Sequence, residues 1–120
     1  MSYYLAKVVF KIVNEEPNAQ IQFDEQLRLI DARNEQEAFF KARMLGVKNE
    51  EEICSENSRK IFWKFIDIPF VKALNEFVDG MEIYSCIKET ETNEGYENYV
   101  KLRAQQIQNS FEKNGVIFSS

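Results

Sequence analysis

The sequence contains no histidine, and this absence excludes several kinds of chemistry at once. Without imidazole there is no serine–histidine or cysteine–histidine pair, no histidine general base and no histidine metal ligand. The two cysteines, Cys54 and Cys86, are too few for a structural zinc site and lack CxxC spacing. The four glycines stand singly, so no glycine-rich phosphate-binding loop is present. We therefore expect no enzyme activity, no cofactor and no metal.

Basic charge is also scarce, since 15 Lys and Arg face 20 Asp and Glu, for a net charge of −5. Nucleic-acid binding normally needs a basic face that neutralises phosphates, so we expect no nucleic-acid partner. No apolar run approaches the roughly 18 residues of a membrane span, and the N-terminus has no basic leader. We expect a cytoplasmic protein that does not bind membranes.

What the sequence has in abundance is aromatic and β-branched residues, which favour strands. Residues 3–13 are apolar on both faces of a strand, which indicates a central position in a sheet. Turn residues follow at 14–18, and residues 20–32 resume alternation, so the two segments predict a hairpin. Residues 59–68 predict a third strand that ends at Pro69. Residues 81–88 predict a fourth, after a helical turn within residues 71–78.

Two helices are predicted from periodicity and capping residues. Asn34 with Glu37 matches an N-cap and its capping-box partner, and Gly46 is the expected C-terminal stop. The second helix is predicted at residues 95–113. Its apolar stripe comprises Tyr96, Tyr99, Val100, Arg103, Ala104, Ile107 and Phe111.

Together these elements predict a single α+β domain over residues 1–120. The expected architecture is a four-stranded antiparallel sheet (β-β-α-β-β) with helices packed on it and a C-terminal helix. If the first helix makes a crossover, strand one lies inside the sheet and the strand order is 2-1-3-4.

Carboxylates and aromatic residues are the remaining candidates for a site. Asp67 and Glu82 are predicted on strands that could be neighbours, where they would form either an acid–base pair or cross-strand partners of Lys7 or Lys64. Trp63, with Phe62 and Phe65, would form either a stacking platform for a ligand or part of the core. The structural role is favoured in both cases.

Four segments in order resemble one family: Tyr3-Tyr4-Leu5-Ala6-Lys7, Glu37-Ala38 with Lys41-Ala42, Phe65-Ile66-Asp67-Ile68, and Asp79-Gly80-Met81-Glu82-Ile83-Tyr84-Ser85. It is the bacterial family known as domain of unknown function 4288. The resemblance covers about residues 3–88, leaves the C-terminal helix as an extension, and has Tyr3 where many members have Trp. It implies a bacterial cytoplasmic α+β domain and no particular activity. The candidate binding residues are Lys7, Trp63, Asp67, Glu82 and Tyr84.

The leading hypothesis is a non-catalytic protein-interaction domain whose partner is a second copy of itself or another protein. It depends on a sheet that is apolar on both faces, with few helices available to cover it. One alternative is a small-ligand-binding or regulatory domain that uses the region around Trp63. Another is an acidic immunity-type inhibitor of a basic toxin, suggested by size and charge.

Overall fold

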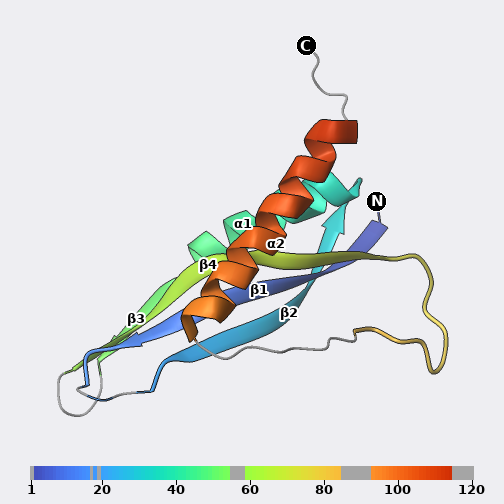
Figure 1. The fold of residues 1–120 in the computed structure, drawn as a ribbon. Coiled ribbons are helices and arrows are strands. Elements are labelled where there is room, and N and C mark those ends of the chain that lie inside the picture. The colour runs from blue at the N-terminus through green and yellow to red at the C-terminus, as the bar shows by residue number, and fades with distance from the viewer. Residues whose placement is uncertain (1, 17, 19, 55–58, 85–92, 115–120) are drawn as a thin grey trace.

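The computed structural model describes residues 2–16, 18, 20–54, 59–84 and 93–114. The elements, in chain order, are β1 (Ser2–Asn14), β2 (Gln22–Ala32), α1 (Glu35–Lys48), β3 (Glu51–Cys54), β4 (Lys60–Leu74) and α2 (Asn93–Asn114). The four strands form one antiparallel sheet in the order β2-β1-β4-β3, and both helices pack on it (Figure 1). The predicted fold class, with its C-terminal helix, is confirmed.

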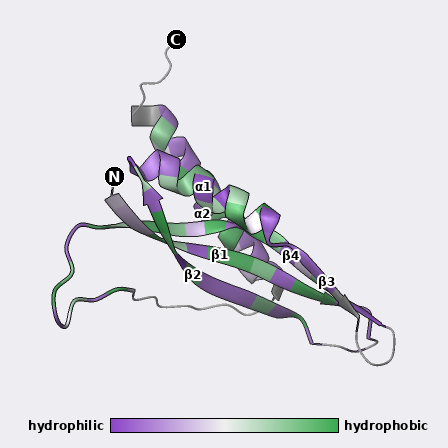
Figure 2. Cartoon of the chain, turned by 180° about the vertical axis from the view of Figure 1, so that it is seen from behind, coloured by the Kyte–Doolittle hydropathy of each residue, from purple (hydrophilic) through white to green (hydrophobic). Residues whose placement is uncertain are grey.

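β1 lies inside the sheet because its residues are apolar on both faces. Every residue from Tyr4 to Phe10 is buried, and β1 pairs with β2 on one side and β4 on the other. Tyr4, Ala6, Val8 and Phe10 belong to the main core cluster, so we call this side of the sheet the inner face. The opposite side, which carries Leu5, Lys7 and Val9 of β1, is the outer face. In Figure 2 β1 is mostly hydrophobic, whereas β2 beside it is mostly hydrophilic.

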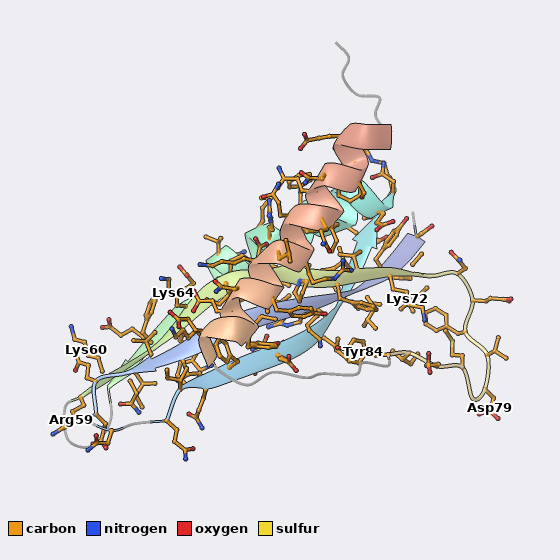
Figure 3. The ribbon with its side chains drawn as sticks, viewed as in Figure 1. Arg59, Lys60, Lys64, Lys72, Asp79 and Tyr84 are labelled. Atoms are coloured by element: carbon orange, nitrogen blue, oxygen red, sulfur yellow. The ribbon has the colours of Figure 1, made fainter. Side chains whose placement is uncertain are left out.

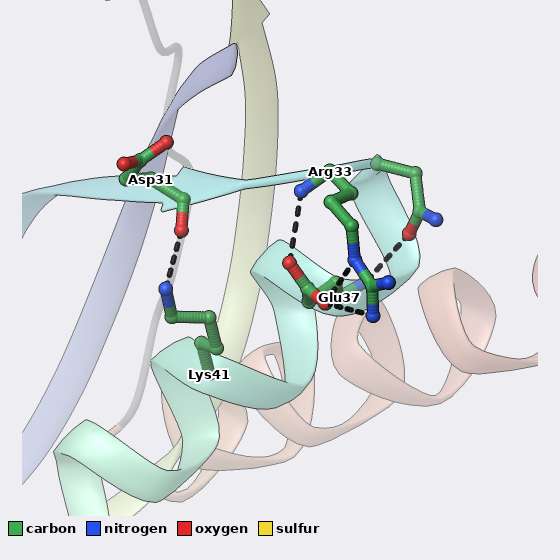
Figure 4. A network of polar contacts seen from close by, with 5 residues as sticks. Asp31, Arg33, Glu37 and Lys41 are labelled. Atoms are coloured by element: carbon green, nitrogen blue, oxygen red, sulfur yellow. Dashed lines mark hydrogen bonds and ion pairs between the residues drawn. The ribbon is translucent and has the colours of Figure 1, made fainter. Parts of the chain in front are cut away.

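α1 covers the inner face and begins where the sequence predicts. The Asn34 side chain accepts a hydrogen bond from the Glu37 amide at 2.8 Å, which satisfies one of the free amides of the first turn. The Glu37 carboxylate turns back to the amide and guanidinium of Arg33, and Lys41 donates to the Asp31 carbonyl (Figure 4). These bonds join the start of α1 to the end of β2.

The expected helix stop at Gly46 is wrong, since α1 continues to Lys48. Gly46 is buried, and a Cβ atom at this position would overlap the ring of Phe65 on β4. Glycine is therefore required here because the helix backbone lies directly against an aromatic side chain of the sheet.

The prediction that Pro69 ends the third strand is also wrong, because β4 runs on to Leu74. Lys7 of β1 pairs with Phe70 of β4, and Val9 pairs with Asp67. Two steps along β1 therefore correspond to three steps along β4, so β4 has one extra residue here. Pro69 thus lies at a bulge, one of the few places in a strand where a missing N–H is tolerated. The helical turn expected within residues 71–78 is absent as well, since Val71 and Leu74 belong to β4.

The fourth strand is not the predicted one. Residues 81–84 form no strand, and the rest of the predicted segment, residues 85–88, lies outside the described part of the chain. The fourth position is taken by β3, whose residues Glu51–Cys54 pair with Lys60–Trp63. The predicted sheet is therefore right in its number of strands, but its last strand is assigned to the wrong segment.

α2 lies against β4 and is an integral part of the core (Figure 1). Tyr96 and Val100 pack with Val9 and Ile66 on the outer face, and Ala104 and Ile107 pack with the inner-face cluster. β3 pairs with only the first residues of β4, so α2 covers an edge that would otherwise be open. The stripe prediction is confirmed at these four buried positions, whereas Tyr99 is exposed.

Candidate functional site

Two of the five candidate residues, Lys7 and Tyr84, are in direct contact. Lys7 on β1 is buried, with 5% of its surface exposed, and its ammonium donates a hydrogen bond to the Tyr84 hydroxyl. The same ammonium lies 4.3 Å from the centroid of the Tyr84 ring, a cation–π arrangement. Figure 3 shows Tyr84 beneath the sheet, on the segment that returns from the Asp79 turn.

Glu25 on β2 completes this cluster and was not recognised from the sequence. Its carboxylate lies 3.8 Å from the Lys7 ammonium and accepts a hydrogen bond from the hydroxyl of Tyr96 on α2. The cluster joins β1, β2, α2 and the 81–84 segment across the outer face, and it pairs a buried cation with a carboxylate. Such pairing is the usual condition for burying a charge, so the cluster explains how Lys7 can lie inside the sheet.

The proposed Asp67–Glu82 pair does not form within the described chain. Both oxygens of Asp67 accept hydrogen bonds from Arg43 of α1, at 2.9 and 3.0 Å. Glu82 is exposed, and its backbone carbonyl accepts a hydrogen bond from Lys72. The described charge partner of Asp67 is therefore Arg43 of α1, and not Lys7 or Lys64, the two partners considered from the sequence.

Trp63 is half-buried and belongs to the wall of a cleft. It packs on the inner-face core and lines a polar cleft of about 460 Å³. β2 contributes Asp24, Gln26 and Arg28 to this cleft, and residues 48–51 line its other side. Cations, carboxylates and an indole thus line the same cleft, which suits a small ligand that carries both charges.

The second edge of β2 is a different kind of candidate site. β2 is 11 residues long and pairs with β1, and within the described residues no strand pairs with its other edge. Leu27 and Leu29 project from the outer face of this strand with 44% and 59% of their surface exposed. Unpaired backbone groups beside exposed leucines can receive a further strand.

A third surface lies on the side of α1 that faces away from the sheet. Phe40, Met44 and Val47 follow one another at helical spacing and are exposed. Phe40 contacts the rings of Phe39 and Phe111, so one end of this stripe adjoins the core. Nothing in the described chain indicates what would cover the rest of it.

A family model described as domain of unknown function (DUF4288) matches residues 3–85. The chain belongs to this family. The DUF4288 region contains the whole cleft beside Trp63 and the Lys7, Glu25 and Tyr84 members of the cluster, whereas Tyr96 lies beyond it on α2. No curated protein and no solved structure matches the chain.

The sequence contained a partial signal for the residues that were missed. Every second residue of β2 from Phe23 to Leu29 lies on one face, and Phe23, Leu27 and Leu29 make this face apolar, whereas Glu25 between them is charged. An acidic residue on the otherwise apolar face of a strand, opposite a strand that carries Lys7 and Lys11 on the same face, predicts an ion pair across that face. The register places Glu25 opposite Val9 and Lys7 opposite Leu27, so the two charges meet diagonally.

No helix in the described part of the chain is both long and apolar enough to cross a membrane.

Proposed function

We propose that this chain is a non-catalytic protein-interaction domain of the bacterial cytoplasm, and that it binds its partner by strand addition at β2. The edge of β2 that no strand of the described residues occupies, called the open edge below, carries the proposal. It offers a row of backbone donors and acceptors, and the exposed side chains of Leu27 and Leu29 supply apolar area beside them.

The polar residues of the sheet support a binding role rather than catalysis. Asp67 is held by Arg43, and Lys7 is enclosed by Tyr84 and Glu25. A general acid or base must reach the proton that it transfers, and these groups are engaged with one another inside the fold. Their arrangement serves to fix α1, α2 and the 81–84 segment on the sheet.

The proposal is tested by photo-crosslinking in cells of the source bacterium. A photoreactive phenylalanine replaces Leu29 on the β2 edge or, as a matched control, Leu102, which is similarly exposed at 57% on α2. We expect one discrete protein adduct from position 29 and none from position 102. Mass spectrometry of the adduct distinguishes a second copy from another protein, and an adduct with a basic toxin would identify the inhibitor alternative. Absence of any protein adduct at position 29 would overturn the proposal.

A second candidate function is small-ligand binding in the cleft beside Trp63. The observation that favours it is the mixed charge of the lining, with Arg28 and Lys48 on one hand and Asp24 and Glu51 on the other. Trp63 is the single tryptophan of the chain, so its fluorescence reports on this cleft alone. Titration with free amino acids and small zwitterions should quench or shift this emission, and Arg28→Gln should weaken the effect. Unchanged emission across the panel contradicts this function.

A further inference from the structure

The open edge of β2 is complementary to itself. Two copies of one strand can pair antiparallel about a two-fold axis that is normal to the sheet. Residues directly opposite one another then lie on the same face of the sheet. Each residue faces the one equally far from the axis on its other side, so an axis through residue 26 pairs 25 with 27 and 24 with 28. If the axis passes through Gln26, Asp24 lies opposite Arg28 of the second copy, and Arg28 lies opposite the second Asp24. Each such dimer therefore contains two cross-strand pairs of opposite charge.

Neighbouring registers lack this complementarity. An axis through Glu25 sets that carboxylate against its own copy, and an axis through Arg28 sets two guanidinium groups together. An axis through Leu27 places Asp24 opposite the apolar Ile30. Like charges directly opposite one another in a ladder are destabilising, so charge selects the register centred on Gln26.

The apolar residues agree with the same register. On the outer face it places Phe23 opposite Leu29 of the second copy, twice per dimer. Phe23 already packs edge-on against Tyr96 with ring centroids 4.7 Å apart, and Leu29 is the more exposed leucine of the strand. Pairing would therefore extend the outer-face core of each copy across the joint.

We propose that the partner at this edge is a second copy of the chain, paired β2 to β2 antiparallel about Gln26. The two four-stranded sheets then form one continuous sheet of eight strands. In the isolated chain Arg28 donates to Gln26 and Gln26 donates to Asp24, so these side chains already lie in a row along the edge. On pairing, Arg28 exchanges its own Gln26 for the Asp24 of its partner. This inference rests on the proposed function, since it names the partner of the same edge.

Charge reversal tests both the partner and the register. Sedimentation velocity should show a dimer for the wild-type chain. Asp24→Arg and Arg28→Asp should each weaken it by about tenfold or more, because each creates two like-charge pairs. An equimolar mixture of the two variants should dimerise again, because the two arginines of one variant then face the two aspartates of the other. This rescue also shows that both variants are folded, and Glu35→Arg on exposed α1 serves as the charge-matched control.

Three results overturn the inference. The first is a strictly monomeric wild-type chain; if position 29 still crosslinks to another protein, the strand-addition function survives without self-pairing. The second is a dimer that neither single variant weakens, which places the interface elsewhere. The third is a mixture that fails to associate while both variants melt cooperatively, which contradicts the register. If position 29 also yields no adduct, the proposed function fails with it.

Discussion

Arg43 and Asp67 form a two-point ion pair, with the guanidinium Nε and Nη2 atoms 2.9 and 3.0 Å from the two carboxylate oxygens. The pair joins α1 to β4, and the third nitrogen of Arg43 donates to Gln108 of α2. One side chain thus connects both helices to the sheet beside the bulge at Pro69.

Replacing Asp67 with Asn should destabilise the fold by about 1–2 kcal/mol at this partly shielded site, because the amide has one acceptor oxygen in place of two and turns an NH2 donor toward the guanidinium. Urea unfolding of Asp67→Asn, Arg43→Met and the double variant measures the coupling between them. Additive losses would show that the pair contributes nothing as a unit.

Gly46→Ala should cost about 1–3 kcal/mol, although alanine is the better helix former, because the new methyl group meets the Phe65 ring. Thermal unfolding measures the loss. Phe65→Leu, combined with Gly46→Ala, should recover part of it by making room. If Gly46→Ala stabilises the chain, the close approach of α1 to β4 is wrong.

α2 should behave as a core element. Ile107→Ala should cost about 2–5 kcal/mol, whereas Leu102→Ala on the exposed side of the same helix should change stability by under about 0.5 kcal/mol. Removal of residues 93–120 should leave an aggregating or poorly folded chain. A soluble truncated protein with cooperative unfolding near that of the full chain would instead make α2 a docking helix.

Stability should fall in acid partly through Glu97, whose carboxylate lies 3.0 Å from Lys101 and 3.1 Å from Lys11 of β1. The hydrogen bond from Lys101, followed by that from Lys11, holds the pKa of Glu97 below its usual range, against the opposing effect of partial burial. Because the pKa of Glu97 is lower in the folded than in the unfolded chain, its contribution to the free energy of unfolding is complete above the usual pKa of about 4.3. This contribution is lost as the pH falls through the pKa of the folded chain.

The matched variant is Glu97→Gln, compared with wild type by denaturant unfolding from pH 7 to pH 3. The wild-type chain should be more stable at pH 7, and the two curves should converge as the pH falls below about 4. A difference that persists unchanged at pH 3 would exclude the ion pairs as its source.

Tyr84 should anchor the 81–84 segment through its contacts with Lys7 and Phe70. Tyr84→Phe keeps the ring over the ammonium and removes only the hydroxyl acceptor, so it should cost about 1 kcal/mol. Tyr84→Leu should cost more, because the cation–π contact is lost too. Ile83→Ala, at a neighbouring exposed position, is the control. Equal losses for Phe and Leu would show that the ring does not interact with Lys7.

The sequence predicted those elements whose signals are local. β1 is recognisable from apolar residues on both faces, α1 from the Asn34 cap, and α2 from a stripe that continues for several turns. The errors arise where a tertiary contact, rather than the local sequence, determines the local structure. Pro69 is tolerated only because β4 bulges, and Gly46 is selected by Phe65 rather than by a helix end. β3 is missed because three successive glutamates, Glu50–Glu52, carry no strand signal of their own.

The candidate site was predictable only in part, for the same reason. Lys7 and Tyr84 were identified as separate residues, but their contact depends on a segment that crosses the outer face 77 positions later in the chain. Asp67 and Glu82 were expected on neighbouring strands because a strand was predicted at residues 81–88, whereas the described residues 81–84 form none. The open edge of β2 could not be recognised before the strand order was known, since an alternating strand has the same pattern at an edge and in the interior.

Hydrogen exchange along β2, followed as the protein concentration rises, tests the central claim most directly. Of the strand amides of residues 22–32, those directed away from β1 should exchange quickly in dilute solution and slow as the chains associate, by a factor that follows the dimer population. The amides of α1 should keep the same rates throughout and provide the internal control. The account is contradicted if β2 exchange is independent of concentration, or if protection appears on α1 around Phe40 and Met44 instead.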